Sequence, residues 1–201
     1  MGSEAKLFDG SCVDAVREQF ERQRYVGLKS LITDGLASML CAHLTARVRA
    51  NKVSRSSTEG LESTSEAGAD PLMENVLRGL TPRIEELTGL ELYPTYSFCR
   101  LYRGGDRLTK HLDRKSCEVS VSINLGQVGE NPWPLWISGP TGSHAATLAP
   151  GDALLYRGIE CEHWRDPFEG KELAQLFLHY VDKSGPYVGW KFDRREALNT
   201  T

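Results

Sequence analysis

The hydrophobic pattern of this 201-residue chain changes its period once, near Glu91. Before this point apolar residues recur every three or four positions, which is the spacing of an amphipathic helix. After it they alternate with polar residues, which is the spacing of a half-buried strand. A helical half followed by many short strands, separated by Gly, Pro and Asp, predicts an α+β protein whose sheets close into a sandwich or barrel.

Capping residues and apolar stripes predict three helices in the first half. Asp34 can cap a long helix, and Asp70-Pro71 combines an N-cap with a proline at the first helical position, where no N–H is needed. Pro82 would restart that last helix, and Gly89 would end it. The expected elements are helices over 13–23, 34–50 and 70–89, with an edge strand over 25–28.

The segment 51–69 between two of these helices is rich in Ser, Thr, Gly and Glu and almost free of large apolar residues. Such a composition buries too little apolar surface to order itself, so we expect a flexible loop. At this length one domain is the simplest organisation. We divide the domain 1–201 into a helical support (1–90), a strand-rich core (91–182) and a C-terminal tail (183–201).

The clearest strand signal is the alternation over 117–125, where apolar residues share one face and Glu118, Ser120, Ser122 and Asn124 share the other. The polar face either looks into a barrel or faces water on an outer strand, which is the commoner arrangement in antiparallel sheets. A polar interior would suit a polar substrate. Further strands are expected over 92–102, 135–138, 145–148, 152–156, 161–164 and 172–181.

The pattern with the most chemical content is His111-Leu112-Asp113, taken together with His163 farther along the chain. An imidazole and a carboxylate two residues apart on an extended strand point the same way. His163 follows a turn and strand and could bring a second imidazole to them. Two histidines and one carboxylate on one face of a metal leave three positions open, which is the usual ligand set of non-haem Fe(II) oxygenases. The alternative is that these histidines are hydrogen-bonded core or surface residues without a metal.

The other three histidines have weaker claims to a functional role. His43 lies on the apolar stripe of the helix expected over 34–50 and should be a packed or partly exposed core residue. His144 falls in a turn and should be solvated. His179, on the last strand, could face a pocket or make a hydrogen bond in the core.

Charge and cysteine content argue against several classes of protein. A net charge of -3 gives no basic footprint for nucleic acid or an anionic membrane, and no apolar run is long enough to span a bilayer. No signal peptide is evident. The five cysteines are scattered without a C-x-x-C pair, which disfavours disulfides and makes zinc a poorer metal than iron. We expect a soluble cytoplasmic protein with a small-molecule substrate and neither nucleic acid nor membrane as a partner.

The second half contains four motifs of one known family. They are Leu101-Tyr102-Arg103-Gly104-Gly105, the H-x-D at His111 and Asp113, the turn and strand Pro150–Tyr156, and His163. Together they resemble the 2-oxoglutarate- and Fe(II)-dependent dioxygenases, specifically the small prolyl-4-hydroxylase-like branch. The similarity runs from about Tyr96 to Asp182, and the N-terminal helices are similar to those that buttress the barrel in that family.

This resemblance implies a double-stranded β-helix, or jelly roll, supported by the N-terminal helices. It implies Fe(II) bound by His111, Asp113 and His163, with 2-oxoglutarate as the chelating co-substrate, O2 as the oxidant and ascorbate in a supportive role. Oxidative decarboxylation would yield succinate and CO2 and drive hydroxylation of an unactivated C–H bond. A halogenase is disfavoured, because such enzymes lack the carboxylate that Asp113 provides.

One residue of the family pattern is missing. In the family a basic residue about ten positions after the second metal-binding histidine holds the far carboxylate of 2-oxoglutarate, and this chain has Leu173 there. A buried carboxylate needs a cation or several hydrogen bonds. We expect Lys171, on the polar side of the last strand, to take this role, with Arg165 as the second candidate and Arg100 as the third. Tyr102 falls where the family often places a tyrosine that hydrogen-bonds the co-substrate.

These residues lead to one principal function, and three more functions are compatible with them. We expect a hydroxylase of a small polar molecule, such as an amino acid or a biosynthetic intermediate. The first alternative is a non-catalytic jelly-roll binding protein. The missing basic residue favours this alternative, and the intact ligand set argues against it. The ligand set would also suit a cupin-like metal enzyme that does not use 2-oxoglutarate, or a peptidyl-prolyl hydroxylase.

Two further segments bear on substrates and partners. The loop 127–134 carries Trp133 between prolines, which suits either a lid or an indole that anchors the loop in the core. The tail, with Tyr187, Trp190 and Phe192, is expected to pack on the body or on a second copy of the chain. A homodimer is therefore the protein partner to consider.

Overall fold

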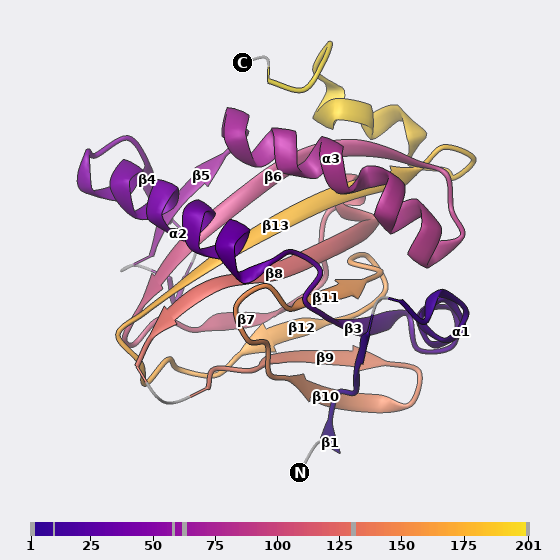
Figure 1. Ribbon diagram of the computed structural model, residues 1–201, viewed down its shortest axis with the longest axis horizontal. Coiled ribbons are helices and arrows are strands. Elements are labelled where there is room, and N and C mark those ends of the chain that lie inside the picture. The colour runs from indigo at the N-terminus through magenta and orange to yellow at the C-terminus, as the bar shows by residue number, and fades with distance from the viewer. Residues whose placement is uncertain (1–2, 10, 58, 62–63, 130–131, 200–201) are drawn as a thin grey trace.

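The computed structural model describes residues 3–9, 11–57, 59–61, 64–129 and 132–199, and in it two β-sheets lie one above the other (Figure 1). In order across the sheet, the larger one comprises β2 (Leu7–Asp9), β3 (Tyr25–Lys29), β11 (Ala153–Tyr156), β8 (Val119–Val128), β13 (Glu172–Asp182), β6 (Leu92–Arg103), β5 (Ser65–Gly68) and β4 (Ser54–Arg55). The smaller one comprises β1 (Ser3–Glu4), β10 (Gly142–Ala146), β9 (Leu135–Gly139), β12 (His163–Arg165) and β7 (Leu108–His111). The expected α+β class is confirmed.

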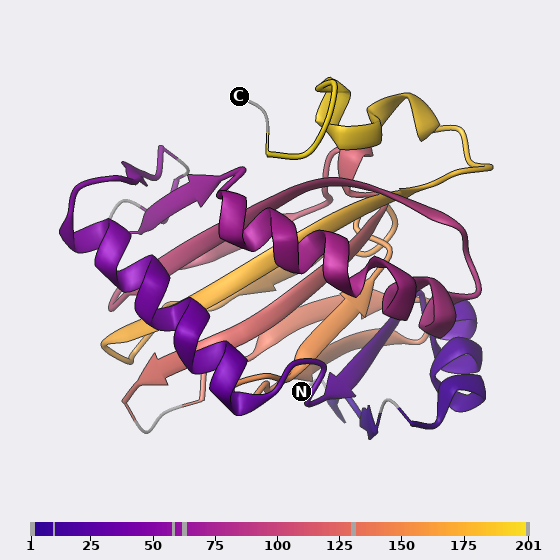
Figure 2. The same ribbon diagram turned by 45° about the horizontal axis from the view of Figure 1, so that its top comes forward.

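The expected helices form, and two of them cover the outer face of the larger sheet (Figure 2). The helices are α1 (Val13–Gln23), α2 (Asp34–Arg49) and α3 (Pro71–Thr88), with short 3-10 helices η1 (Lys115–Cys117) and η2 (Val188–Arg194). Thr33 rather than Asp34 caps α2, because its Oγ1 accepts the N–H of Leu36 at 3.3 Å. Pro82 lies inside α3 without restarting it, and Gly89 ends the helix in the left-handed region at φ 73°.

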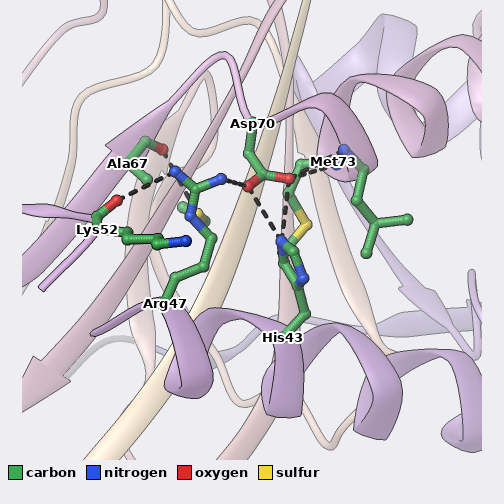
Figure 3. Close-up of polar contacts among 8 residues, drawn as sticks. His43, Arg47, Lys52, Ala67, Asp70 and Met73 are labelled. Carbon is green, nitrogen blue, oxygen red and sulfur yellow. Dashed lines mark hydrogen bonds and ion pairs between the residues drawn. The ribbon is translucent and has the colours of Figure 1, made fainter. Parts of the chain in front are cut away.

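Asp70 joins α3 to α2 as well as capping it (Figure 3). Its carboxylate accepts the N–H groups of Leu72 and Met73 at 3.0 and 3.2 Å, and it also pairs with His43 and Arg47 on α2. Burial alone would raise the pKa of Asp70, but hydrogen bonds from His43 and the Met73 N–H, with the charge of Arg47, hold this pKa below its usual value. His43 therefore serves as a partly exposed partner of a buried carboxylate.

Both faces of β8 are buried, and they differ in chemistry. Val121 and Ile123 belong to the hydrophobic cluster that includes the helices, whereas Ser120 and Ser122 are fully buried on the opposite face and hydrogen-bonded there. Of the two alternatives for the polar face of this strand, the structure therefore shows the interior one for these two serines. The smaller sheet covers the face that would otherwise meet water. Glu118 precedes the strand.

Three local predictions are wrong. The segment 51–69 contains β4 and β5, and β5 pairs with β6, whose backbone groups would otherwise form an open edge. The strand β3 is not an edge strand, because β2 pairs with its outer side. His144 lies in β10 rather than in a turn, and its Nδ1 lies 2.7 Å from Ser3 Oγ.

The C-terminal segment packs on the body of the same chain. Arg195 pairs with the buried Glu74 of α3 at 2.5 Å, and Asp193 pairs with Arg114 at 2.9 Å. All five cysteines are free. Within the described ranges no helix has both the length and the apolar character needed to cross a membrane.

Candidate metal centre

The two strands that carry the candidate histidines are neighbours in the smaller sheet. The strand β7 ends at His111, β12 begins at His163, and their antiparallel pairing sets these two residues opposite each other. Asp113 lies just beyond β7 rather than on it, and its backbone N–H donates to Gly158 O at 2.9 Å. The three residues predicted as ligands therefore come together at two adjacent strand ends.

The ligand atoms of these residues converge on one point. Asp113 Oδ1 lies 3.8 Å from His111 Nε2 and 3.6 Å from His163 Nε2. The three side chains form a group whose ligand atoms all lie within 4.8 Å of one another. These separations are too long for good hydrogen bonds, but they suit a cation bound about 2 Å from each atom.

Backbone carbonyls fix the orientation of both imidazoles. His111 Nδ1 lies 2.8 Å from Thr109 O, and His163 Nδ1 lies 3.0 Å from Cys161 O. A carbonyl oxygen only accepts, so each Nδ1 donates, and the neutral form of each ring directs its Nε2 lone pair to the shared centre. Burial lowers the pKa of His163, which favours the neutral imidazole that a metal requires.

The second oxygen of the Asp113 carboxylate has separate partners. Ser120 Oγ lies 3.0 Å from Asp113 Oδ2 and 2.9 Å from His179 Nδ1. Burial lowers the pKa of His179 to about 4, so its ring is neutral. His179 lines the cavity and also makes an interior hydrogen bond. The two alternatives considered for it, facing a pocket and hydrogen-bonding in the core, are therefore both present. Asp113, Cys117 and His179 form a second group of ligand atoms within 4.8 Å of one another, and it shares the same carboxylate.

A cavity of about 510 Å³ opens onto the three candidate ligands. Its aromatic lining residues are Tyr96, Phe98, Tyr156 and Phe177, and its charged ones beyond the ligands include Arg100, Arg114, Asp193 and Arg195. Arg100 pairs with Glu66 at 3.3 Å and Arg114 pairs with Asp193 at 2.9 Å, so these two cations already have counterions. Such a wall suits a molecule with a planar or apolar part as well as polar groups.

Neither a known family model nor a curated protein matches the sequence, but solved structures match the fold. A prolyl-4-hydroxylase from Pseudomonas putida gives a TM-score of 0.69 at 18% identity, covering 84% of this chain and 98% of that chain. A member of the 2OG-Fe(II) oxygenase family from Burkholderia pseudomallei gives 0.68 at 15%, covering 90% and 95%. The non-haem, α-ketoglutarate-dependent epimerase SnoN of nogalamycin biosynthesis gives 0.73 at 14%, covering 88% and 85%. The chain has the fold of the 2-oxoglutarate/Fe(II) oxygenases.

The likeness to these structures supports the oxygenase fold that the sequence motifs implied, and the structure places Lys171, the first choice of co-substrate anchor, outside the last strand. The strand β13 starts at Glu172, so Lys171 precedes it and its side chain is exposed. The alternation that placed Lys171 on the polar face ends before reaching it. Arg100, the third choice, lines the cavity but is paired with Glu66.

Arg165, the second choice, is a buried cation inside this oxygenase fold. Its side chain donates to Trp133 O and, at 3.1 Å, to Gln175 Oε1, while Gln175 Nε2 donates to Ser122 Oγ at 2.8 Å. No carboxylate of the described chain forms an ion pair with Arg165, and burial lowers its pKa to about 10. Because a buried charge without a counterion is costly, this position is suited to an anionic ligand. Trp133 is buried and donates to Asp166 O at 2.6 Å, so it anchors its loop in the core.

Tyr102 is a second buried polar group in this region, and both it and Arg165 pack on the ring of Trp133. Its side chain is fully buried, and its hydroxyl makes no hydrogen bond of good geometry with the described residues, although the Arg100 guanidinium lies nearby. A buried hydroxyl in this state is satisfied when a ligand oxygen reaches it. Arg165 and Tyr102 are therefore together suited to an anionic ligand.

The sequence analysis assigned no role to Gln175 or Gly158, and it placed Ser122 on a polar face suited to a substrate without identifying Gln175 as its partner. Gln175 and Ser122 lie on the polar faces of two predicted strands, so the alternation that predicted those strands also contained a signal for them. Gly158 gave no such signal, because its importance depends on how closely the chain approaches Asp113.

Proposed function

We propose that this protein is an Fe(II)- and 2-oxoglutarate-dependent oxygenase whose facing sheets form a double-stranded β-helix. The observation that carries the proposal is the convergence of His111 Nε2, His163 Nε2 and Asp113 Oδ1 within an oxygenase fold. Two imidazoles and one carboxylate suit Fe(II) and leave positions for a chelating co-substrate and O2. The carbonyl partners of both Nδ1 atoms support this assignment, because they orient the free lone pairs for a metal.

The interior residues would bind the co-substrate and exclude water from the reaction. Arg165 and Tyr102 would hold the far carboxylate of 2-oxoglutarate, and Gln175 orients the guanidinium. With Fe(II) and 2-oxoglutarate bound, O2 would deliver one oxygen atom to succinate and the other to a substrate C–H bond, with release of CO2. Phe98 and Phe177 on the cavity wall would exclude water from the reacting carbon.

The proposed substrate is a small molecule, such as an amino acid or a biosynthetic intermediate. A cavity of about 510 Å³ falls within the usual range for small-molecule sites. The matched structures include SnoN in complex with nogalamycin RO and a prolyl hydroxylase from Trichoplax adhaerens in complex with a peptide. A peptidyl-prolyl substrate is therefore the second candidate.

The alternative of a non-catalytic binding protein relied on the missing basic residue on the last strand. Arg165 provides a buried cation from the opposite sheet, so the argument for a lost co-substrate site is weaker. This supports the enzymatic assignment over simple binding.

The proposal is tested by aerobic incubation with Fe(II), ascorbate, 2-oxoglutarate and chloride against a panel of amino acids, aromatic biosynthetic intermediates and prolyl peptides. We expect succinate in step with a product heavier by one oxygen, and neither with His163→Ala. A chlorinated product would contradict hydroxylation. Succinate formation by His163→Ala at the wild-type rate would contradict the metal centre.

A further inference from the structure

We propose that Ser120 and His179 form a positioning relay that keeps Asp113 a ligand through one oxygen only. This inference rests on the proposed function, because it concerns how the Fe(II) site keeps room for its co-substrate. The two carboxylate oxygens of Asp113 already have different surroundings. Oδ1 lies 3.8 and 3.6 Å from the two histidine Nε2 atoms, whereas Oδ2 lies 3.0 Å from Ser120 Oγ.

The direction of the relay follows from its donors and acceptors. A carboxylate oxygen only accepts, so the single proton of Ser120 is donated to Asp113 Oδ2. The carbonyl of Cys117 is a second and longer acceptor at 3.3 Å. With its proton directed there, Ser120 Oγ accepts from His179 Nδ1 at 2.9 Å, so His179 carries its proton on Nδ1.

Packing holds both ends of the relay in place. The His179 ring stacks on Tyr96, with centroids 4.6 Å apart and an interplanar angle of 29°, and His179 is only 5% exposed. On the other side, Gly158 lies against the carboxylate. A Cβ there would overlap Asp113 Oδ2 and lie 2.8 Å from Ser120 Oγ. Asp113 also donates its backbone N–H to Gly158 O at 2.9 Å, so Gly158 lies against both the backbone and the side chain of Asp113.

Binding of Asp113 through one oxygen matters because it determines how many coordination positions on the metal stay open. Two histidines and a carboxylate bound through one oxygen leave three positions, which 2-oxoglutarate and O2 would fill. If Asp113 bound through both oxygens, one of these positions would be lost. Removal of the Ser120 hydroxyl should therefore weaken 2-oxoglutarate binding more than it weakens Fe(II) binding.

The test compares Ser120→Ala with Ser97→Ala, a matched control on β6 whose buried hydroxyl has no partner within the described chain. Under anaerobic conditions, Fe(II) affinity is measured by competition with a chelator. The affinity of the Fe(II)-loaded protein for 2-oxoglutarate is measured from its charge-transfer absorption. We expect Ser120→Ala to bind 2-oxoglutarate about tenfold more weakly with a smaller change in Fe(II) affinity, and Ser97→Ala to match the wild type in both.

A second pair of variants tests the role of His179 directly. This test applies even if Ser120→Ala folds poorly. His179→Asn places an amide N–H where Nδ1–H was and should keep 2-oxoglutarate affinity near the wild-type value, whereas His179→Leu should lose several-fold. Equal affinities in these two variants, or a Ser120→Ala protein that binds 2-oxoglutarate like Ser97→Ala, would overturn the relay. If the wild-type protein itself binds Fe(II) but not 2-oxoglutarate, the proposed function fails instead.

Discussion

Arg165 on β12 of the smaller sheet donates a hydrogen bond of 3.1 Å to Gln175 on β13 of the larger sheet. This bond crosses the interior and places a buried guanidinium beside the last strand, on which the sequence motifs implied a basic residue. The last strand supplies the neutral Gln175, and the neighbouring strand of the other sheet supplies the charge. The buried cation therefore comes from a different element of the fold than the one that the sequence motifs implied.

Replacement of Arg165 should weaken the binding of 2-oxoglutarate. A charge-assisted hydrogen bond contributes about 1.5–3 kcal/mol, so Arg165→Ala should raise the 2-oxoglutarate concentration needed for half-maximal binding about ten- to a hundredfold. Anaerobic titration of the Fe(II)-loaded protein measures this. Lys171→Ala is the control and should behave as the wild type, because Lys171 is exposed. The reverse result, with Lys171→Ala defective and Arg165→Ala normal, would restore the first expectation from the sequence.

Replacement of Tyr102 should separate ligand binding from folding. The hydroxyl of Tyr102 is buried without a well-formed hydrogen bond, so Tyr102→Phe should not lower the Tm of the free protein. The same change should weaken 2-oxoglutarate binding about tenfold, because a hydrogen bond to a charged ligand is lost. Thermal unfolding with and without Fe(II) and 2-oxoglutarate measures both effects. A lower Tm for the free variant, with unchanged stabilisation by the ligand, would show that the hydroxyl acts only in the fold.

Substitution of Gly158 should lower the affinity for Fe(II) indirectly, through the position of Asp113. A Cβ at this position would overlap Asp113 Oδ2, so Gly158→Ala should displace the carboxylate and lower Fe(II) affinity about ten- to a hundredfold. Chelator competition measures this affinity. Gly79→Ala on α3 is the control, because no atom lies within 4 Å of its added Cβ, and it should leave Fe(II) affinity unchanged. Equal Fe(II) affinity in the two variants would contradict the close approach of Gly158.

Acid should weaken the link between α2 and α3 through Asp70. The pKa of Asp70 is held below its ordinary value in the folded protein, so its contribution is complete at neutral pH and is lost as the pH falls below about 4. Asp70→Asn should lower the free energy of unfolding at pH 7 by about 1–3 kcal/mol and by less at pH 3. Denaturant unfolding at the two pH values checks this. A loss that is the same at both values would mean that the charge of Asp70 does not contribute.

The sequence predicted those features that depend on local spacing. The alternation over 117–125 and the Asp70-Pro71 cap each involve a few neighbouring residues, and the H-x-D pair needs only an extended backbone to bring both side chains near one point. The position of His163 opposite His111 depends on the pairing of β7 with β12, which spacing alone does not determine. The sequence motifs of a known family supplied that link.

The errors arose where tertiary contacts decide the outcome. Lys171 and Arg165 have the same charge, and only the start of β13 and the cover of the smaller sheet leave one exposed and the other buried. The segment 51–69 has the composition of a loop, but the open edge of β6 pairs with part of it. In both cases a distant element supplied the deciding contact.

The central claim is that one Fe(II) binds at His111, Asp113 and His163 and that 2-oxoglutarate binds on that metal. Anaerobic equilibrium dialysis, which counts the Fe(II) and 2-oxoglutarate bound per chain, tests this most directly. We predict one of each in the wild-type protein, with 2-oxoglutarate binding at least about tenfold weaker when Fe(II) is omitted and both lost in His163→Ala. Stoichiometric Fe(II) binding that survives His163→Ala, or 2-oxoglutarate binding that is equally tight without metal, would contradict the account.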